Sequence, residues 1–90
     1  MAHFMVIERF KNGDAVPVYR RLREKGRMAP TGVEYVASCV TDDLKVCYQL
    51  MKGERAKVDQ WIALWSDVID FEVLPALTSA EAQTRISPRL

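Results

Sequence analysis

Two glutamates, Glu8 and Glu72, are the residues of this 90-residue chain that are best suited to acid–base chemistry. Glu8 lies in the apolar run 4–10 and Glu72 in the run 69–74, and both runs are rich in residues typical of β-strands. If these strands are antiparallel neighbours, the two carboxyl groups fall at a similar height near one end of the sheet and can share a face. Two carboxylates in a partly dry cavity cannot both ionise at low cost, so the pKa of one rises. The pair is therefore our candidate for a general acid or base that acts on a small organic molecule.

The alternative role for the two glutamates is structural. One or both of them can lie at the rim of the sheet and form salt bridges across a dimer interface. Lys45, on a strand predicted to lie beside the run 4–10, could instead neutralise Glu8.

Three polar residues, Ser38, Cys47 and Gln49, are expected on the same open face of the sheet as these carboxylates. They could donate and accept hydrogen bonds in a largely apolar pocket, which is the usual composition of a small-molecule site. They could equally bond to one another or to a partner chain. Arg27, just beyond the predicted end of a helix, could reach the mouth of such a cavity and hold an anion. The candidate ligand-binding residues are Phe10, Arg27, Ser38, Lys45, Cys47 and Gln49.

The two cysteines, Cys39 and Cys47, favour neither a disulfide nor a metal site, because they fall on opposite faces of the predicted strands. One histidine, His3, and two cysteines without close spacing make a poor zinc site. Cys47 would need a basic partner to act as a nucleophile, and His3 lies at a position of the opposite parity. A lone terminal His3 is also a weak axial ligand for haem. We therefore expect no metal and no cofactor, and a reducing, cytoplasmic compartment.

The charge balance does not favour nucleic acid or an anionic membrane as a partner. Thirteen Lys and Arg residues face twelve Asp and Glu residues. No apolar run approaches the roughly 20 residues of a membrane span, and the N-terminus lacks the features of a signal peptide. We expect one small domain without a membrane segment.

The predicted elements alternate strands and helices. Asp14 is a plausible N-cap of a helix that ends near Gly26. Asp42 and Asp43 form a short turn, which predicts an antiparallel hairpin with Cys39 opposite Val46. The predicted strands are 4–10, 33–41, 44–51 and 69–74, the predicted helices are 14–26 and 55–66, and 78–90 is predicted to be a polar tail.

The order β-α-β-β-α-β predicts an α+β, ferredoxin-like domain over residues 1–77, with a four-stranded antiparallel sheet in the order 4-1-3-2. Right-handed crossovers place both helices on one face of the sheet. We expect the helices to cover Met5, Ile7, Tyr48, Leu50, Phe71 and Val73. The residues left without a cover are Phe4, Val6, Phe10, Val36, Val40, Met51 and Leu74.

An uncovered apolar face of this size usually marks an interface. We therefore expect a homodimer in which two sheets meet face to face, a symmetric contact through Phe4, Val6, Val36, Val40, Met51 and Leu74. The alternative is that the tail, 78–90, folds back over this face or packs on the partner.

Several motifs resemble a family of short, uncharacterised bacterial proteins, a domain of unknown function in the dimeric α+β barrel class. The resemblance covers roughly residues 1–77. It is carried by Phe4-Met5-Val6-Ile7-Glu8-Arg9-Phe10, Gly26-Arg27-Met28 with Pro30, Cys47-Tyr48-Gln49-Leu50-Met51, Trp61-Ile62 with Trp65-Ser66-Asp67, and Asp70-Phe71-Glu72-Val73. It implies a dimeric barrel and leaves the chemistry open, since the class contains cofactor-independent monooxygenases, lactone isomerases and haem enzymes.

Two functions are therefore compatible with the sequence. The first is a homodimeric module that binds a small hydrophobic metabolite between its two sheets, or that simply assembles. The second is a cofactor-independent enzyme, similar to a monooxygenase or an isomerase, in which Glu8 and Glu72 act as acid and base. A cavity with a carboxylate of shifted pKa would favour ligand chemistry over simple assembly.

Overall fold

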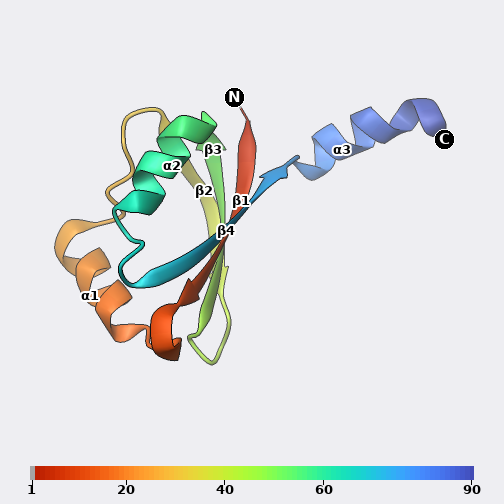
Figure 1. The fold of residues 1–90 in the computed structure, drawn as a ribbon. Helices are drawn as coiled ribbons and strands as arrows, with labels where there is room; N and C mark the ends of the chain where they lie inside the picture. The colour runs from red at the N-terminus through yellow and green to blue at the C-terminus, as the bar shows by residue number, and fades with distance from the viewer. Residues whose placement is uncertain (1) are drawn as a thin grey trace.

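The computed structural model describes residues 2–90, which form a four-stranded antiparallel sheet with α1 and α2 on one side (Figure 1). The strands are β1 (His3–Phe10), β2 (Val33–Val40), β3 (Val46–Gly53) and β4 (Ile69–Ala76). The helices are α1 (Val16–Lys25), α2 (Arg55–Ala63) and α3 (Ser79–Ile86), and the 3-10 turns η1 (Lys11–Gly13) and η2 (Ser87–Arg89) follow β1 and α3. The predicted β-α-β-β-α-β order is confirmed, and the predicted polar tail contains a third helix.

The sheet has the strand order β2-β3-β1-β4, as predicted from the split βαβ pattern. β1 lies at the centre and pairs antiparallel with both β3 and β4. Val6 stands opposite Gln49 on one side and Val73 on the other, and Glu8 stands opposite Cys47 and Phe71. These cross-strand pairs determine which side chains share a face.

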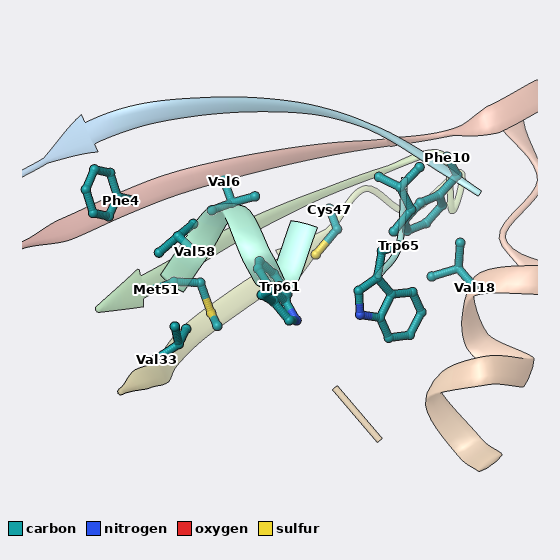
Figure 2. Packing of buried hydrophobic residues seen from close by; sticks show 11 residues of the cluster. Phe4, Val6, Phe10, Val18, Val33, Cys47, Met51, Val58, Trp61 and Trp65 are labelled. Carbon is teal, nitrogen blue, oxygen red and sulfur yellow. The ribbon is translucent and has the colours of Figure 1, made fainter. Parts of the chain in front are cut away.

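The helices cover the face of Phe4, Val6, Glu8 and Phe10, and this corrects the predicted assignment of the two faces. Val6 and Met51 have exposed fractions of 0 % and lie in the core between sheet and helices (Figure 2). The predicted dimer residues Phe4, Val6 and Met51 are therefore core residues, and Val40 packs against them. Phe10, which was also expected to be uncovered, is buried as well. Both faces of β1 are apolar, so its composition could not show which face the helices cover.

The opposite face, which we call the open face, is centred on the cross-strand pairs Ile7–Tyr48 and Met5–Leu50. Leu74 lies beside Met5 on this face, as predicted, and both Leu74 and Tyr48 are 44 % exposed. Phe71 and Val73 lie on the helix-covered face as predicted, but they share it with Glu8 and Val6, with which they pair, and not with the expected Met5 and Ile7.

The β2–β3 hairpin has a longer turn and a different register from the prediction. Val40 pairs with Cys47, and Cys39 pairs with Tyr48 in place of Val46. Thr41 closes the turn, because its Oγ1 accepts a hydrogen bond from the Val46 N–H at 3.1 Å. The ladder also shifts between Tyr35 and Ala37, and Tyr35 then pairs with Met51. This bulge brings Tyr35 to the helix-covered face.

Helix α1 ends at Gly26 as its sequence predicts, but its N-cap residue is Ala15 and not the predicted Asp14. The Asp14 carboxylate accepts a hydrogen bond from the Val16 N–H at 3.0 Å, and Pro17 lies in the first turn, where its missing N–H costs little. Gly26 follows the last turn with φ 69°, a conformation that glycine adopts without strain, and donates its N–H to the Leu22 carbonyl.

Helix α3 follows β4 and extends away from the sheet (Figure 1). Its N-terminus has a capping box, in which the Thr78 side chain accepts from the Glu81 N–H and the Glu81 carboxylate accepts from the Thr78 N–H. Glu81 also lies 3.6 Å from the His3 Nδ1 atom. In the single chain the open face is not covered by α3.

Candidate functional site

A pocket of about 90 Å³ lies between the sheet and the two helices that cover it. Its partly exposed lining residues come from α1, β2 and the connection between them, so the pocket opens between α1 and β2. Most of the lining is apolar. The lining residues are Glu8, Phe10, Val18, Tyr19, Leu22, Arg27, Ser38, Val40, Cys47, Gln49, Trp61, Trp65 and Ile69.

Glu8 is the buried carboxyl group of this pocket, with an exposed fraction of 5 %. Burial raises the pKa of Glu8 from 4.5 to about 7, against the opposing effects of a hydrogen bond from Gln49 and the charge of Arg27. Among residues 2–90, no Lys, Arg or His side chain forms an ion pair with Glu8. At neutral pH this group can therefore either hold or release a proton.

Gln49 connects Glu8 to Arg27. Its amide nitrogen donates a hydrogen bond to Glu8 Oε2, and its amide oxygen accepts one from Arg27 Nε at 3.1 Å. The Arg27 guanidinium also stacks on the ring of Tyr35, 3.7 Å from the ring centroid. The Tyr35 hydroxyl in turn lies 2.8 Å from Ser38 Oγ. A polar chain thus runs along one wall of an otherwise apolar pocket.

Two tryptophans hold the backbone of Arg27 in place. The indole N–H groups of Trp61 and Trp65 both donate to the Arg27 carbonyl oxygen, at 2.9 and 3.0 Å. The next residue, Met28, has φ 59°, a conformation that is uncommon for a residue with a side chain. The two hydrogen bonds hold the Arg27 carbonyl beside this strained residue, and the Arg27 side chain lines the pocket.

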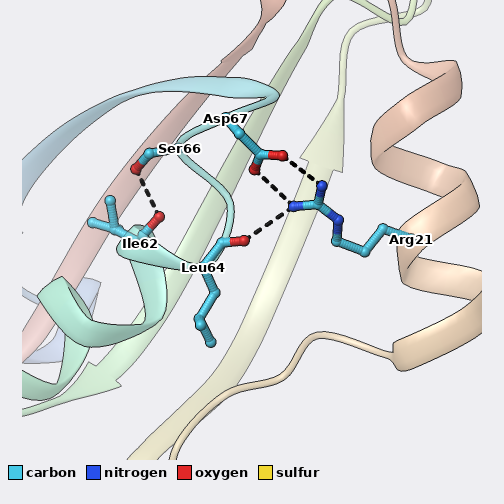
Figure 3. Close-up of polar contacts among 5 residues, drawn as sticks. All are labelled: Arg21, Ile62, Leu64, Ser66 and Asp67. Carbon is cyan, nitrogen blue, oxygen red and sulfur yellow. Dashed lines mark hydrogen bonds and ion pairs between the residues drawn. The ribbon is translucent and has the colours of Figure 1, made fainter.

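Arg21 ties α1 to the turn between α2 and β4 (Figure 3). Its guanidinium donates to both carboxylate oxygens of Asp67, at 2.8 and 2.6 Å, and to the Leu64 carbonyl at 3.0 Å. These contacts hold the pKa of Asp67 down at about 2. Arg21 also lies 5.4 Å from the ring centroid of Trp65. The tether therefore positions one wall of the pocket relative to the other.

Cys47 lines the pocket as an inert thiol. Burial, with a smaller contribution from the charge of Glu8, raises its pKa to about 12, so Cys47 is protonated at neutral pH. The pKa of Tyr19 is raised as well, first by burial. Cys39 is exposed and Cys47 is buried, and both are free thiols. Within residues 2–90, no group of three or more His, Cys, Asp or Glu side chains lies close enough together to hold a metal ion.

Most of the predicted binding residues lie together, although not where they were expected. Phe10, Arg27, Ser38, Cys47 and Gln49 all line the pocket that contains Glu8. We expected this pocket between the sheets of two chains, and it lies between the sheet and the helices of one chain. Sequence reasoning missed the contacts of Trp61 and Trp65 with the Arg27 carbonyl.

Two predicted site residues lie elsewhere. Glu72 pairs with Ile7, so it is on the open face, where it forms an ion pair with Arg9 at 3.1 Å. The expected juxtaposition of Glu8 and Glu72 is therefore wrong, because the register of β1 and β4 pairs Glu72 with Ile7 and so places the two glutamates on opposite faces of the sheet. Lys45 lies in the exposed turn before β3 and does not line the pocket.

The fold and the site define a small α+β protein of ferredoxin-like topology with a buried carboxyl group in a pocket under its helices. The chain belongs to the family described as Domain of unknown function (DUF3303), whose model matches residues 2–90. No curated protein and no solved structure matches the chain. No helix within residues 2–90 is both long and apolar enough to cross a membrane.

Proposed function

We propose that this protein binds a small, largely apolar molecule with one polar end in the pocket between α1 and the sheet. One observation carries the proposal: Glu8 is buried in the wall of an apolar pocket and forms no ion pair with a cation of residues 2–90. Keeping this carboxylate ionised costs about 3 kcal/mol relative to water, because its pKa is raised from 4.5 to about 7. A group with such a cost in a concave site is typical of a functional position.

The size of the pocket limits the ligand. An apolar cavity of about 150 Å³ accommodates a benzene molecule. A pocket of about 90 Å³ that opens to solvent can therefore enclose a short aliphatic chain or part of one aromatic ring. The remaining atoms of the ligand would lie between α1 and β2.

The two tryptophans of the chain, Trp61 and Trp65, both line the pocket, so intrinsic fluorescence reports its occupancy. We expect phenol and cyclopentanol to change this fluorescence with saturation at millimolar concentration. Ser38→Leu should abolish the response because it fills the pocket, and Ser79→Leu on exposed α3 is the matched control. A response that persists unchanged in Ser38→Leu would count against this site.

A second candidate function is acid–base catalysis with Glu8 as the proton-transferring group. The pKa of about 7 favours it, because a general acid or base works best near the ambient pH. Glu72 has no part in this version, since it lies on the other face. If Glu8 abstracts a proton from carbon, a bound ketone such as cyclopentanone should exchange its α-hydrogens in D2O. Glu8→Gln should stop that exchange.

We also propose that two copies of the chain form a homodimer through the open face, with Ile7, Tyr48 and Leu50 at the centre of the contact. The support is the exposure of a contiguous apolar surface on the two central strands, β1 and β3. A two-fold symmetric contact buries this surface on both chains at once.

Two free thiols, one of them exposed, support a reducing compartment such as the cytoplasm.

A further inference from the structure

The pocket contains a cation that is already held in position. Arg27 is fixed by hydrogen bonds at its carbonyl oxygen and at Nε, and by stacking on Tyr35. Its two terminal nitrogens make no hydrogen bond or ion pair with any side chain in the described part of the chain, residues 2–90. A guanidinium with its terminal N–H groups free is suited to receive two oxygens of a planar anion.

We infer that the ligand of this pocket is a small organic acid, whose carboxylate binds the terminal nitrogens of Arg27 while Glu8 takes up one proton from solvent. This inference rests on the proposed function and names the class of ligand. The apolar lining favours a hydrocarbon group next to the carboxylate over a fully polar anion such as phosphate.

The uptake of a proton by Glu8 follows from the charges in the pocket. Within residues 2–90, Glu8 and Arg27 are its only charged lining residues, so their charges cancel when Glu8 is ionised. A bound carboxylate would add a second negative charge in a site with little water, and protonation of Glu8 removes the excess. The protonated Glu8 can then donate its O–H to the ligand.

Within residues 2–90, no other group that lines the pocket can take up this proton at neutral pH. Tyr19 faces it from α1 and Cys47 from β3, and the pKa of each is raised, so both are already protonated. Arg27 faces it from the connection before β2 and retains its charge. The remaining elements bring no charge: α2 contributes Trp61, the turn between α2 and β4 contributes Trp65, and β4 contributes Ile69. Because burial already raises the pKa of Glu8 to about 7, a modest further rise completes the uptake near pH 8.

The test compares butyrate and benzoate with the neutral analogues butyramide and benzamide, by isothermal titration calorimetry and tryptophan fluorescence. We expect the acids to bind at least about tenfold more tightly than the amides at pH 7. Their affinity should fall by up to about tenfold per pH unit above pH 8. Titrations in two buffers with different ionisation enthalpies should show uptake of nearly one proton at pH 8.

Three variants assign the effect to residues. Arg27→Gln should remove the preference for acids, and Arg27→Lys should restore part of it, whereas Arg85→Gln on α3 is a control with the same loss of charge. Glu8→Gln should retain acid binding but lose both the proton uptake and the pH dependence. A purely structural role of Glu8 would change affinity without changing the proton count.

Each other outcome overturns the inference. If the amides bind as tightly as the acids, or if the acids bind without proton uptake, the ligand class is wrong, although the pocket is still a binding site. If inorganic phosphate binds at Arg27 and none of the organic acids does, the apolar part of the inference is wrong. If none of these probes nor phenol alters the tryptophan fluorescence, the inference and the proposed function are both wrong.

Discussion

Glu8 combines features that are rarely found together, since it is almost fully buried, forms no ion pair within the described residues 2–90 and accepts a hydrogen bond from Gln49. The cause is its position on the central strand under two helices, where the neighbouring side chains are mostly apolar. Burial disfavours the charged form and moves the pKa to about 7. The buried Glu8 therefore makes the folded state less stable at neutral and alkaline pH, and in return the pocket contains a group whose charge can change near neutral pH.

The first prediction concerns stability as a function of pH. The folded state binds a proton at Glu8 up to pH about 7, whereas the unfolded state releases it near 4.5, so the free energy of unfolding falls as the pH rises through this window. The loss should reach up to about 3 kcal/mol and should not increase further above pH 8. Glu8→Gln should flatten this part of the profile and stabilise the protein at pH 8, as measured by urea unfolding.

Glu24→Gln, on the exposed side of α1, is the matched control and should leave the profile unchanged. Parallel pH profiles for the wild type and Glu8→Gln would show that the buried carboxyl group has no shifted pKa.

The second prediction concerns the thiols. The pKa of Cys47 is about 12 and its side chain is buried, so in the Cys39→Ser variant iodoacetamide should leave the native protein unmodified at pH 8. Labelling should begin only when urea unfolds the chain, as followed by mass spectrometry. The Cys47→Ser variant, which keeps exposed Cys39, provides the comparison. Fast labelling of Cys47 in the native state would mean that it is accessible as a thiolate.

At the scale of elements, the pocket depends on contacts between segments that are far apart in the sequence. Arg21 on α1 binds Asp67 in the turn before β4, and the two tryptophans at and beyond the end of α2 hold the Arg27 carbonyl before β2. Because the helices are short, few apolar side chains pack between α1 and the sheet. These polar contacts therefore help to determine how α1 lies over the sheet.

The third prediction tests the tether of α1. Asp67→Asn should lower the melting temperature slightly and should loosen α1. Amide hydrogen exchange should become faster than in the wild type, and this increase should be larger in Val16–Lys25 than in the sheet. The folded-state pKa of Asp67 is lowered to about 2, so its contribution is present above pH about 4 and is lost as the pH falls toward 2. High salt should reduce the difference from the wild type, because both side chains are partly exposed.

Asp42→Asn, in the exposed β2–β3 turn, removes the same charge without a tether. Equal hydrogen exchange of α1 in both variants would show that packing alone positions this helix.

At the scale of the whole molecule, the sheet has one face covered by α1 and α2 and one open face. The open face combines apolar residues on the central strands with the Arg9–Glu72 ion pair on β1 and β4. A monomer would leave these apolar side chains in water, and α3 extends away from the body without covering them (Figure 1). Association of two chains is the simplest way to bury them.

The fourth prediction is that Tyr48→Lys converts the dimer to a monomer of half the mass in light scattering. Tyr48 is 44 % exposed in the single chain, so the substitution should leave the fold intact while it places a charge at the centre of the proposed contact. Val16→Lys changes another exposed apolar residue, at the start of α1, and should leave the mass unchanged. A monomeric wild type would remove the basis of the dimer, and a dimeric Tyr48→Lys would move the contact elsewhere.

Local sequence patterns predicted the four strands, α1 and α2, their order and the strand order, because turn residues and hydrophobic periodicity act within a few residues of each other. They did not predict α3, which lies in the segment expected to be a polar tail. Alternation along β1 and β3 also predicted correctly that Glu8, Phe10, Cys47 and Gln49 share one face. The polar part of the pocket could therefore be predicted from the sequence. The stacking of Arg27 on Tyr35 could not, since a bulge that no local pattern marked turns Tyr35 to that side.

The tertiary structure alone decided which face the helices cover and the register in which neighbouring strands pair. Both faces of β1 are apolar, so alternation grouped its side chains without showing which group is buried. The pairing of Ile7 with Glu72 separates the two glutamates, and it depends on contacts more than sixty residues apart along the chain. Side-chain alternation is a property of one strand, whereas register and coverage are properties of the packed molecule, and a shift of one residue exchanges the two faces.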